Sequence, residues 1–239
     1  MVKEISEGQA GTVNTVILSG DSPTYGVPVE SGTQFTLDLN TYDLQIHRDE
    51  NGEYAGSPGT KTLGFQLLKD SDIVIKGGEI AADDTKMLVQ NYSNLTLEDV
   101  ILRGTVTDTY VLSNNFGEVH LKGDTQILAT GSTRGKENVA FDLWYGMAKD
   151  GSYDDGVSVY IDDPTVVIQG PIEFGHASRI TDEAQFLERT HLYVCEGYNL
   201  ESLRIPAGYE FVASSIPGYV ELRPVAVAQT PEVVDEPGE

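Results

Sequence analysis

A run of acidic and hydroxyl residues near residue 150 is the first candidate for metal chemistry. Asp150-Gly151-Ser152-Tyr153-Asp154-Asp155-Gly156 places side-chain oxygens at alternate positions, as calcium-binding loops do. Such a loop has glycine at its sixth position and a bidentate acid at its twelfth, but Asp155 and Ile161 stand there. We therefore interpret the run as a solvated turn, and Asp49-Glu50-Asn51-Gly52 as a still weaker candidate.

Two acids, a histidine and an arginine follow: Asp162, Asp163, His176 and Arg179. Inverting glycoside hydrolysis needs two carboxylates about 6.5–9.5 Å apart. The paired acids, Gly-His and Arg-Ile elements resemble those of β-helical glycoside hydrolases. That resemblance places the elements on different coils, whereas here all lie between residues 162 and 180, and the usual acidic element upstream is not evident. We interpret the match as coincidence and predict no catalytic residues.

Other chemical motifs are missing from the sequence. The four histidines have no metal-ligand spacing, and there is no phosphate loop, nucleophile elbow or cysteine pair. Cys195 is the only cysteine, so no intramolecular disulfide can form. The sequence therefore predicts a protein that is not an enzyme and has no metal site and no cofactor.

The densest aromatic cluster is Trp144 and Tyr145, with Tyr153 and Tyr160 nearby. Aromatic side chains on a sheet surface can stack on sugars or anchor a protein partner. Packing in the core or between subunits is the reading we favour for them.

Charge excludes several partners. Thirty-eight acids and fifteen Lys and Arg residues give a net charge of −23, which would repel nucleic acid and anionic lipid. No stretch approaches the roughly 20 apolar residues of a membrane span. The first residues, Met1-Val2-Lys3-Glu4-Ile5-Ser6-Glu7, lack the apolar run of a secretory signal, so we expect the chain to fold in a cytosol.

An internal repeat predicts the fold. Three similar segments lie at Phe65–Ile80, Met87–Leu102 and Tyr110–Leu128. Ile75 and Leu97 are 22 residues apart, and Leu97 and Leu121 are 24 apart. The middle and late parts of the repeat recur in Val166-Val167-Ile168-Gln169 and Pro171-Ile172-Glu173-Phe174. Ile168 lies 47 residues after Leu121, which is about two periods, and Val139–Leu143 marks a strand between them.

Each repeat alternates apolar and polar residues with the period of a strand. Three short strands in 22–24 residues make one coil of a solenoid, whose stacked coils bury a continuous stripe. An antiparallel sandwich lacks such a superperiod. The predicted fold is all-β, a right-handed parallel β-helix, with the handedness undetermined by the sequence itself. The predicted inward-facing stripe is Ile73, Ile75, Leu95, Leu97, Val119, Leu121, Val166 and Ile168.

Polar residues recur at one turn of the repeat. Asp70, Asn91 and Asn114 are 21 and 23 residues apart, and stacked amides can hydrogen-bond along a solenoid axis. We therefore predict that these residues form a structural ladder and not a ligand site.

The ends differ from the middle. An early coil is expected around Phe35–Ile46, followed by a long loop, His47–Lys61. Thr181–Arg189 is predicted to be a short helix, with brief strands at Leu192–Val194, Glu210–Val212 and Tyr219–Leu222. The predicted organisation is an N-terminal cap or attachment segment (1–30), the solenoid (31–180), a C-terminal cap (181–224) and an acidic flexible tail (225–239).

The repeats around Ile73-Val74-Ile75, Leu95-Thr96-Leu97 and Val119-His120-Leu121 resemble the pectate-lyase-like β-helix superfamily. Within it they are most similar to non-catalytic modules of bacteriophage fibres and head decorations. The resemblance covers residues 35–174 and is one of pattern. It implies a virion structural protein assembled in the host cytoplasm, bound to a capsid or tail protein and able to bind host-surface glycans.

Two alternatives stay open: a carbohydrate-active β-helix enzyme acting on polysaccharide, and a fragment of a bacterial surface adhesin. We also predict a homo-oligomer. Residues 186–224 carry more apolar surface than a thin cap needs, and contiguous patches commonly mark interfaces. The resemblance to phage fibres favours a trimer.

Overall fold

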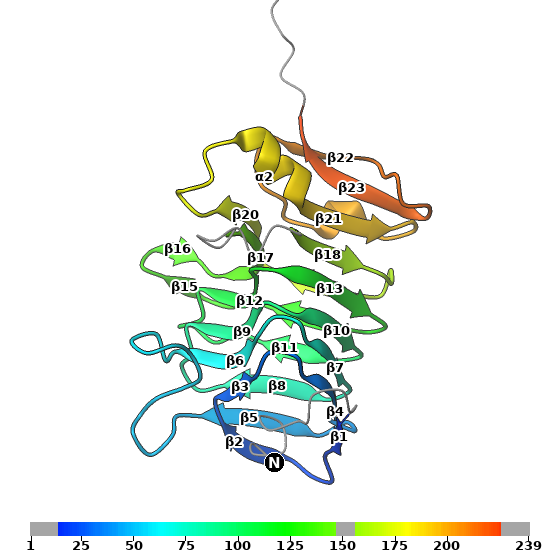
Figure 1. Cartoon of the computed structure of the whole chain (residues 1–239). Helices are drawn as coiled ribbons and strands as arrows, with labels where there is room; N and C mark the ends of the chain where they lie inside the picture. The colour runs from blue at the N-terminus through cyan, green and yellow to red at the C-terminus, as the bar shows by residue number, and fades with distance from the viewer. Residues whose placement is uncertain (1–13, 147–155, 226–239) are drawn as a thin grey trace, which may run out of the picture.

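The computed structural model describes residues 14–146 and 156–225, which form an all-β fold with three parallel sheets (Figure 1). In spatial order the first sheet holds β1 (Asn14–Ile17), β4 (Gln34–Asp38), β7 (Asp72–Lys76), β10 (Asn94–Glu98), β13 (Gly117–Lys122), β18 (Val157–Ile161), β21 (Thr190–Cys195), β23 (Tyr219–Pro224) and β22 (Tyr209–Ala213). The second holds β2 (Ser22–Tyr25), β5 (Asp43–His47), β8 (Glu79–Ala82), β11 (Ile101–Arg103), β14 (Gln126–Leu128) and β19 (Val167–Gln169). The third holds β3 (Val27–Val29), β6 (Leu63–Leu67), β9 (Met87–Asn91), β12 (Tyr110–Asn114), β17 (Val139–Tyr145) and β20 (Ile172–His176).

Consecutive strands enter the three sheets in turn. After β4, β5 and β6 the chain returns to the first sheet with β7, and the same order repeats through β8, β9 and β10. The register keeps equivalent residues side by side: Leu95 pairs with Ile73 on one neighbour and with Val119 on the other. Asp72 and Asn94 are separated by 22 residues and Asn94 and Glu118 by 24, which confirms the predicted repeat.

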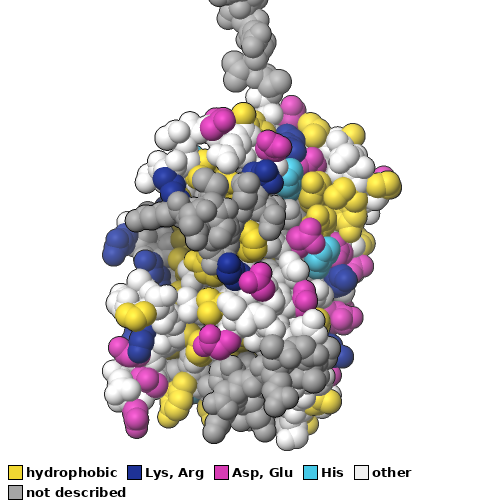
Figure 2. Space-filling model, viewed as in Figure 1, with side chains coloured by type: hydrophobic (Ala, Val, Ile, Leu, Met, Phe, Trp, Pro, Cys, Tyr) yellow, Lys and Arg dark blue, Asp and Glu magenta, His cyan; other side chains and the backbone are white. Residues whose placement is uncertain are grey.

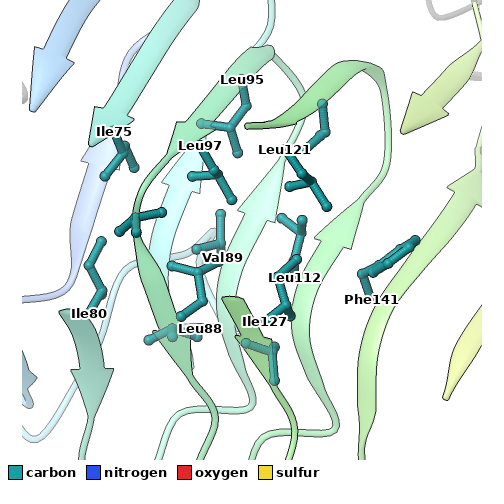
Figure 3. Packing of buried hydrophobic residues seen from close by; sticks show 14 of the residues in the cluster. Ile75, Ile80, Leu88, Val89, Leu95, Leu97, Leu112, Leu121, Ile127 and Phe141 are labelled. Atoms are coloured by element: carbon teal, nitrogen blue, oxygen red, sulfur yellow. The ribbon is translucent and has the colours of Figure 1, made fainter. Parts of the chain in front are cut away.

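The apolar stripe lies in the core between the sheets. All eight predicted residues are buried, and Figure 3 shows Leu97 and Leu121 on neighbouring strands, with Val89 and Leu112 on the side of the core toward which they point. Burying each such side chain contributes about 1.5–3 kcal/mol. Strand alternation explains the pattern, because Ile73 and Ile75 point inward while Asp72, Val74 and Lys76 point outward.

One part of the predicted alignment is wrong. Ile168 pairs with Ile127 in the second sheet, whereas the partner of Leu121 in the first sheet is Ile161. The chain inserts a small hairpin, β15 (Ser132–Thr133) and β16 (Lys136–Glu137), between β14 and β17. This insertion lengthens the coil, so counting two periods from Leu121 reached a strand of a different sheet.

The end strands confirm several local predictions. The helix α2 (Glu183–Arg189) begins at Asp182, whose Oδ1 accepts hydrogen bonds from the N–H groups of Ala184 (2.9 Å) and Gln185 (3.4 Å). The three predicted late strands are β21, β22 and β23, and β21–β23 and β23–β22 pair antiparallel. At the other end, β1, β2 and β3 of the expected N-terminal cap are each the end strand of one sheet.

The predicted loop His47–Lys61 lies between β5 and β6. A 3₁₀ turn, Leu200–Ser202, follows β21. Within residues 14–146 and 156–225 no helix has the length and apolar character needed to cross a membrane.

Candidate functional site

On the outer face of the third sheet, the indole ring of Trp144 packs against the backbone of glycine residues. Trp144 of β17 pairs with Gly175 of β20 and is 38% exposed. A Cβ added to Gly175 would lie 2.6 Å from Trp144 Cε3 and 2.7 Å from Cζ3, and one added to Gly146 would lie 3.4 Å from Nε1. Both halves of the indole therefore lie close to glycine backbone, and the side chain is partly exposed. We name this surface the Trp144 platform.

A buried carboxyl group lies beside the Trp144 platform. Asp142 precedes Trp144 by two residues, so both side chains lie on the same face of β17. Asp142 is 3% exposed, and the Ser113 hydroxyl donates a hydrogen bond to its carboxyl group. Its Oδ1 atom has no hydrogen-bond partner among the described residues. Burial, with a smaller contribution from the charge of Glu173, raises the pKa of Asp142 from 3.8 to about 7.

The next strand adds a second acid. Glu173 of β20 pairs with Asp142, and its Oε1 atom lies 2.6 Å from Lys136 Nζ. Burial raises the pKa of the nearby Tyr110 to about 12, with smaller contributions from the charges of Asp142 and Glu173. An acid with a pKa near neutrality thus lies in register with a second carboxyl group that is bound to a lysine.

A groove extends from Glu173 toward the loop after β21. It has a volume of about 500 Å³ and is lined by Lys136, Glu173, Phe174 and Arg204, with Pro171, Ile172, Ile205 and Pro206 completing it. Arg204 makes a bidentate ion pair with Glu137, with nitrogen–oxygen distances of 2.5 and 2.7 Å. The groove therefore offers charged hydrogen-bonding groups along a partly apolar floor.

The acids and the histidine that the sequence singled out are in different sheets. Asp162 follows β18 of the first sheet, and its Oδ2 and Oδ1 atoms contact His120 Nδ1 (2.8 Å) and the Tyr219 hydroxyl (2.9 Å). Asp163 accepts the Gly123 N–H at 2.7 Å, a turn contact. His176 lies in the third sheet with its ring 4.8 Å from Phe186.

Of that predicted set, only Arg179 lies near the Trp144 platform. A Cβ added to Gly146 would lie 4.0 Å from Arg179 Nη2. The four residues do not share one of the grooves found among the described residues.

The aromatic residues are divided between two sheets. Tyr145 is buried against Phe186, whereas Tyr160 lies on the outer face of the first sheet. The Tyr160 ring stacks on His120 at 4.5 Å and on Tyr193 at 4.8 Å. Because these rings cover one another's faces, only their edges can meet a ligand. Tyr153 lies outside the described residues.

Only the weaker of the two calcium-like runs lies in the described part of the chain. Residues 150–155 of the stronger run lie outside the described residues. In the weaker candidate, Asp49 Oδ1 accepts the N–H groups of Asn51 (2.9 Å) and Glu53 (2.8 Å), which is a solvent-exposed turn. The described part of the chain contains no group of three or more histidine, cysteine or acidic residues arranged for a metal ion.

The predicted ladder is confirmed for two of its three members. Asn91 Nδ2 donates to Asn114 Oδ1 at 2.9 Å, and both side chains are fully buried. The prediction is wrong for Asp70, because the residue of β6 that pairs with Asn91 is Leu67. Asp70 lies in an exposed turn with φ of +59°, so its spacing from Asn91 reflected turn position and not strand register.

Sequence reasoning missed Asp142, Glu173 and Gly175. One signal was available, because Asp142 interrupts the otherwise apolar strand Val139–Tyr145. The pairing of that strand with Glu173 and Gly175 depends on register across a coil of irregular length, and periodicity did not provide it.

Comparison with known proteins adds no relative. No protein-family model, no curated protein and no solved structure matches this chain.

Proposed function

We propose that this chain is a right-handed parallel β-helix that serves a bacteriophage virion as a structural, glycan-binding module. Support for the β-helix comes from three parallel sheets that receive consecutive strands in turn, with β7, β10 and β13 in register. Support for the handedness is general, because crossovers between parallel strands of one sheet are right-handed in about 98% of cases.

The Trp144 platform is the observation that carries glycan binding. A sugar ring presents an apolar C–H face that packs on an indole, while its rim of hydroxyls needs hydrogen-bond partners. Glu173 and Lys136 lie on the adjoining strand and hairpin, Ser113 lies on β12, and Asn115 directly follows that strand. Nucleic acid bases also stack on aromatic rings, but the net charge of −23 opposes a polyanion.

Intrinsic fluorescence tests this binding directly, because Trp144 is the only tryptophan in the chain. The probes are maltohexaose, cellohexaose and purified O-antigen and capsular polysaccharides. We expect a saturable change in emission with at least one of them. Isothermal titration calorimetry of Trp144→Ala should show that binding to the same probe is lost. A panel in which no probe gives a saturable change would contradict the proposal.

A glycine pair provides the matched control. Gly175→Ala should displace the indole, because the new Cβ would lie within 2.7 Å of it, and should weaken binding at least tenfold. Gly20→Ala adds the same methyl group where no atom lies within 4 Å, so it should bind like the wild type. Equal binding by both variants would show that the flat indole is not the contact.

The virion part of the proposal is supported by the pattern resemblance and by the strong negative charge, which keeps a protein soluble at high copy number. Mass spectrometry of purified particles should find the chain in stoichiometric amounts. Recovery of the protein only from the soluble fraction of infected cells would count against it.

The second candidate function, a carbohydrate-active enzyme, is favoured by one observation. Asp142 and Glu173 pair across neighbouring strands beside the Trp144 platform, and the raised pKa of Asp142 suits a proton donor at neutral pH. Reducing-end assays on the same probes separate the two functions. Release of reducing ends by the wild type, lost in both Asp142→Asn and Glu173→Gln, would favour the enzyme over the binding module.

A further inference from the structure

The first sheet ends in a strand with one free edge. β22 is the last strand in the sheet order, and among the described residues it pairs with β23 alone. The Val225 N–H donates to the Gly208 carbonyl at 2.8 Å. Hydrogen-bonded pairs alternate along an antiparallel ladder, so Glu210 and Val212 also bond to β23. The N–H and C=O groups of Tyr209, Phe211 and Ala213 therefore point to the free edge.

Two of the three edges at the opposite end are protected differently. β2 contains Pro23 and β3 contains Pro28, and each is the end strand of its sheet, whereas β1, the other end strand of the first sheet, has no proline. Proline has no N–H and interrupts the row of donors that another strand would use. β22 has the sequence Tyr-Glu-Phe-Val-Ala, with no proline and one charged residue. Its edge therefore keeps a complete hydrogen-bonding row.

The two faces of β22 differ in exposure. Phe211 and Tyr209 pack against the core, and Val212 on the other face is 37% exposed. Figure 2 shows hydrophobic side chains gathered at this end of the first sheet, over β21 and β23. Val212 pairs with Glu221, and Glu210 pairs with Arg223, so the charge of β22 already has an opposite charge beside it.

We infer that β22 pairs antiparallel with β22 of a second copy of this chain, about a two-fold axis at Phe211. In this register Tyr209 faces Ala213 of the other copy, and the outward groups form about six backbone hydrogen bonds. Glu210 faces Val212 of the other copy, so no like charges stand directly opposite. The strand is thus complementary to itself in both hydrogen bonding and charge.

Net charge sets the conditions for pairing. Two copies that each carry −23 repel one another, and salt screens exposed charges over a Debye length of about 10 Å at 0.1 M. Pairing should therefore tighten as salt is added. This inference is independent of glycan binding, because β22 belongs to the first sheet and the Trp144 platform to the third.

Sedimentation equilibrium of the full chain over a concentration series, in about 20 mM and about 300 mM NaCl, tests the pairing. We expect the 26.0 kDa monomer to convert to a species of twice that mass, with at least tenfold tighter association at the higher salt. Ala213→Pro removes an outward N–H that has no partner among the described residues, and it should leave only monomer. Val212→Glu, a second variant that keeps every backbone group, places a carboxylate directly opposite Glu210 of the other copy and should do the same.

The control is Val212→Thr, which keeps the shape and charge of the strand and should still dimerise. Far-UV circular dichroism and the melting temperature verify that each variant is folded. A 26.0 kDa species at every concentration and salt would overturn the pairing. So would an oligomer of any size that both Ala213→Pro and Val212→Glu leave intact.

Discussion

Two columns of residues on opposite faces of the third sheet bury polar groups in different ways. On the inner face the column is Leu67, Asn91, Asn114, Leu143 and Phe174; on the outer face it is Gln66, Gln90, Ser113, Asp142 and Glu173. The two asparagines lie deeper, yet all their hydrogen-bonding atoms have partners. Asp142 lies on the outer face and has an oxygen with none among the described residues.

The partners explain the difference. Asn91 bonds to Ser93 and to the carbonyl of Phe116, and Asn114 Nδ2 donates to the Ser158 carbonyl at 3.0 Å. An amide has both donors and acceptors, so two amides join backbone groups of adjacent coils at a corner where strand pairing ends. A carboxylate can only accept hydrogen bonds, and Ser113 provides one donor. Burial alone therefore does not mark a functional group, whereas burial without a partner does.

The largest effect is expected where a carboxylate replaces a residue of the apolar core. Leu97 is fully buried, and its side chain belongs to the apolar core. Leu97→Asp should abolish folding, and circular dichroism should show no cooperative transition. Leu97→Ala, which adds no charge, should lose about 2–5 kcal/mol and still fold. Wild-type melting of Leu97→Asp would show that the inward register is wrong.

A smaller, pH-dependent effect is expected at Asp142. Below about pH 4 its carboxyl group is protonated in both the folded and the unfolded chain. Between pH 3.8 and about 7 only the unfolded chain ionises, so the free energy of unfolding should fall as pH rises. The full loss, reached above pH 7, is about 4 kcal/mol at most, by conversion of the pKa difference.

Asp142→Asn should remove this loss and make the protein more stable than the wild type at pH 8 but not at pH 4. Urea denaturation at both pH values measures it. Asp72→Asn is the control, because Asp72 is exposed and bonded to Asn94 at the surface. A wild-type free energy of unfolding that does not change between these pH values would show that folding does not raise the pKa of Asp142.

Removing an asparagine from the inner column should lower the free energy of unfolding by an amount that does not depend on pH. Asn114→Ala leaves Asn91 Nδ2 and the Ser158 carbonyl short of a partner and opens a small cavity, which should cost about 2–3 kcal/mol. Urea denaturation at pH 5 and pH 8 should give the same loss. Asn94→Ala, at an exposed amide in the same turn region, should change stability by less than about 0.5 kcal/mol. Equal losses in the two variants would remove the special role of the ladder.

The smallest effect is expected for polar pairs that face solvent. Arg103 makes two contacts of 2.6 Å with Glu79 across the second sheet, but its side chain is half exposed. Arg103→Gln should lower the free energy of unfolding by less than about 1 kcal/mol, and the loss should shrink at high salt. A loss as large as that of Asn114→Ala would mean that outer pairs stabilise this fold as much as buried ones.

The sequence by itself determined the local features of this protein. Strand alternation identified the inward residues, since side chains of a strand alternate between faces whatever the tertiary fold, and the segment Thr181–Arg189 was expected to be helical and contains α2. The 22- and 24-residue spacing placed Ile73, Leu95 and Val119 side by side, because those coils contain no insertion.

Only the tertiary structure decided the features that depend on register across coils of unequal length. In the structure Ile168 lies in the second sheet, and Leu67, not Asp70, pairs with Asn91. Trp144 pairs with Gly175 and packs against it, with Asp142 on the same strand. The physical reason is that each insertion shifts all later spacings, while strand pairing follows burial and backbone hydrogen bonds and not residue count. The Trp144 platform exists because β17 and β20 came into register after such an insertion.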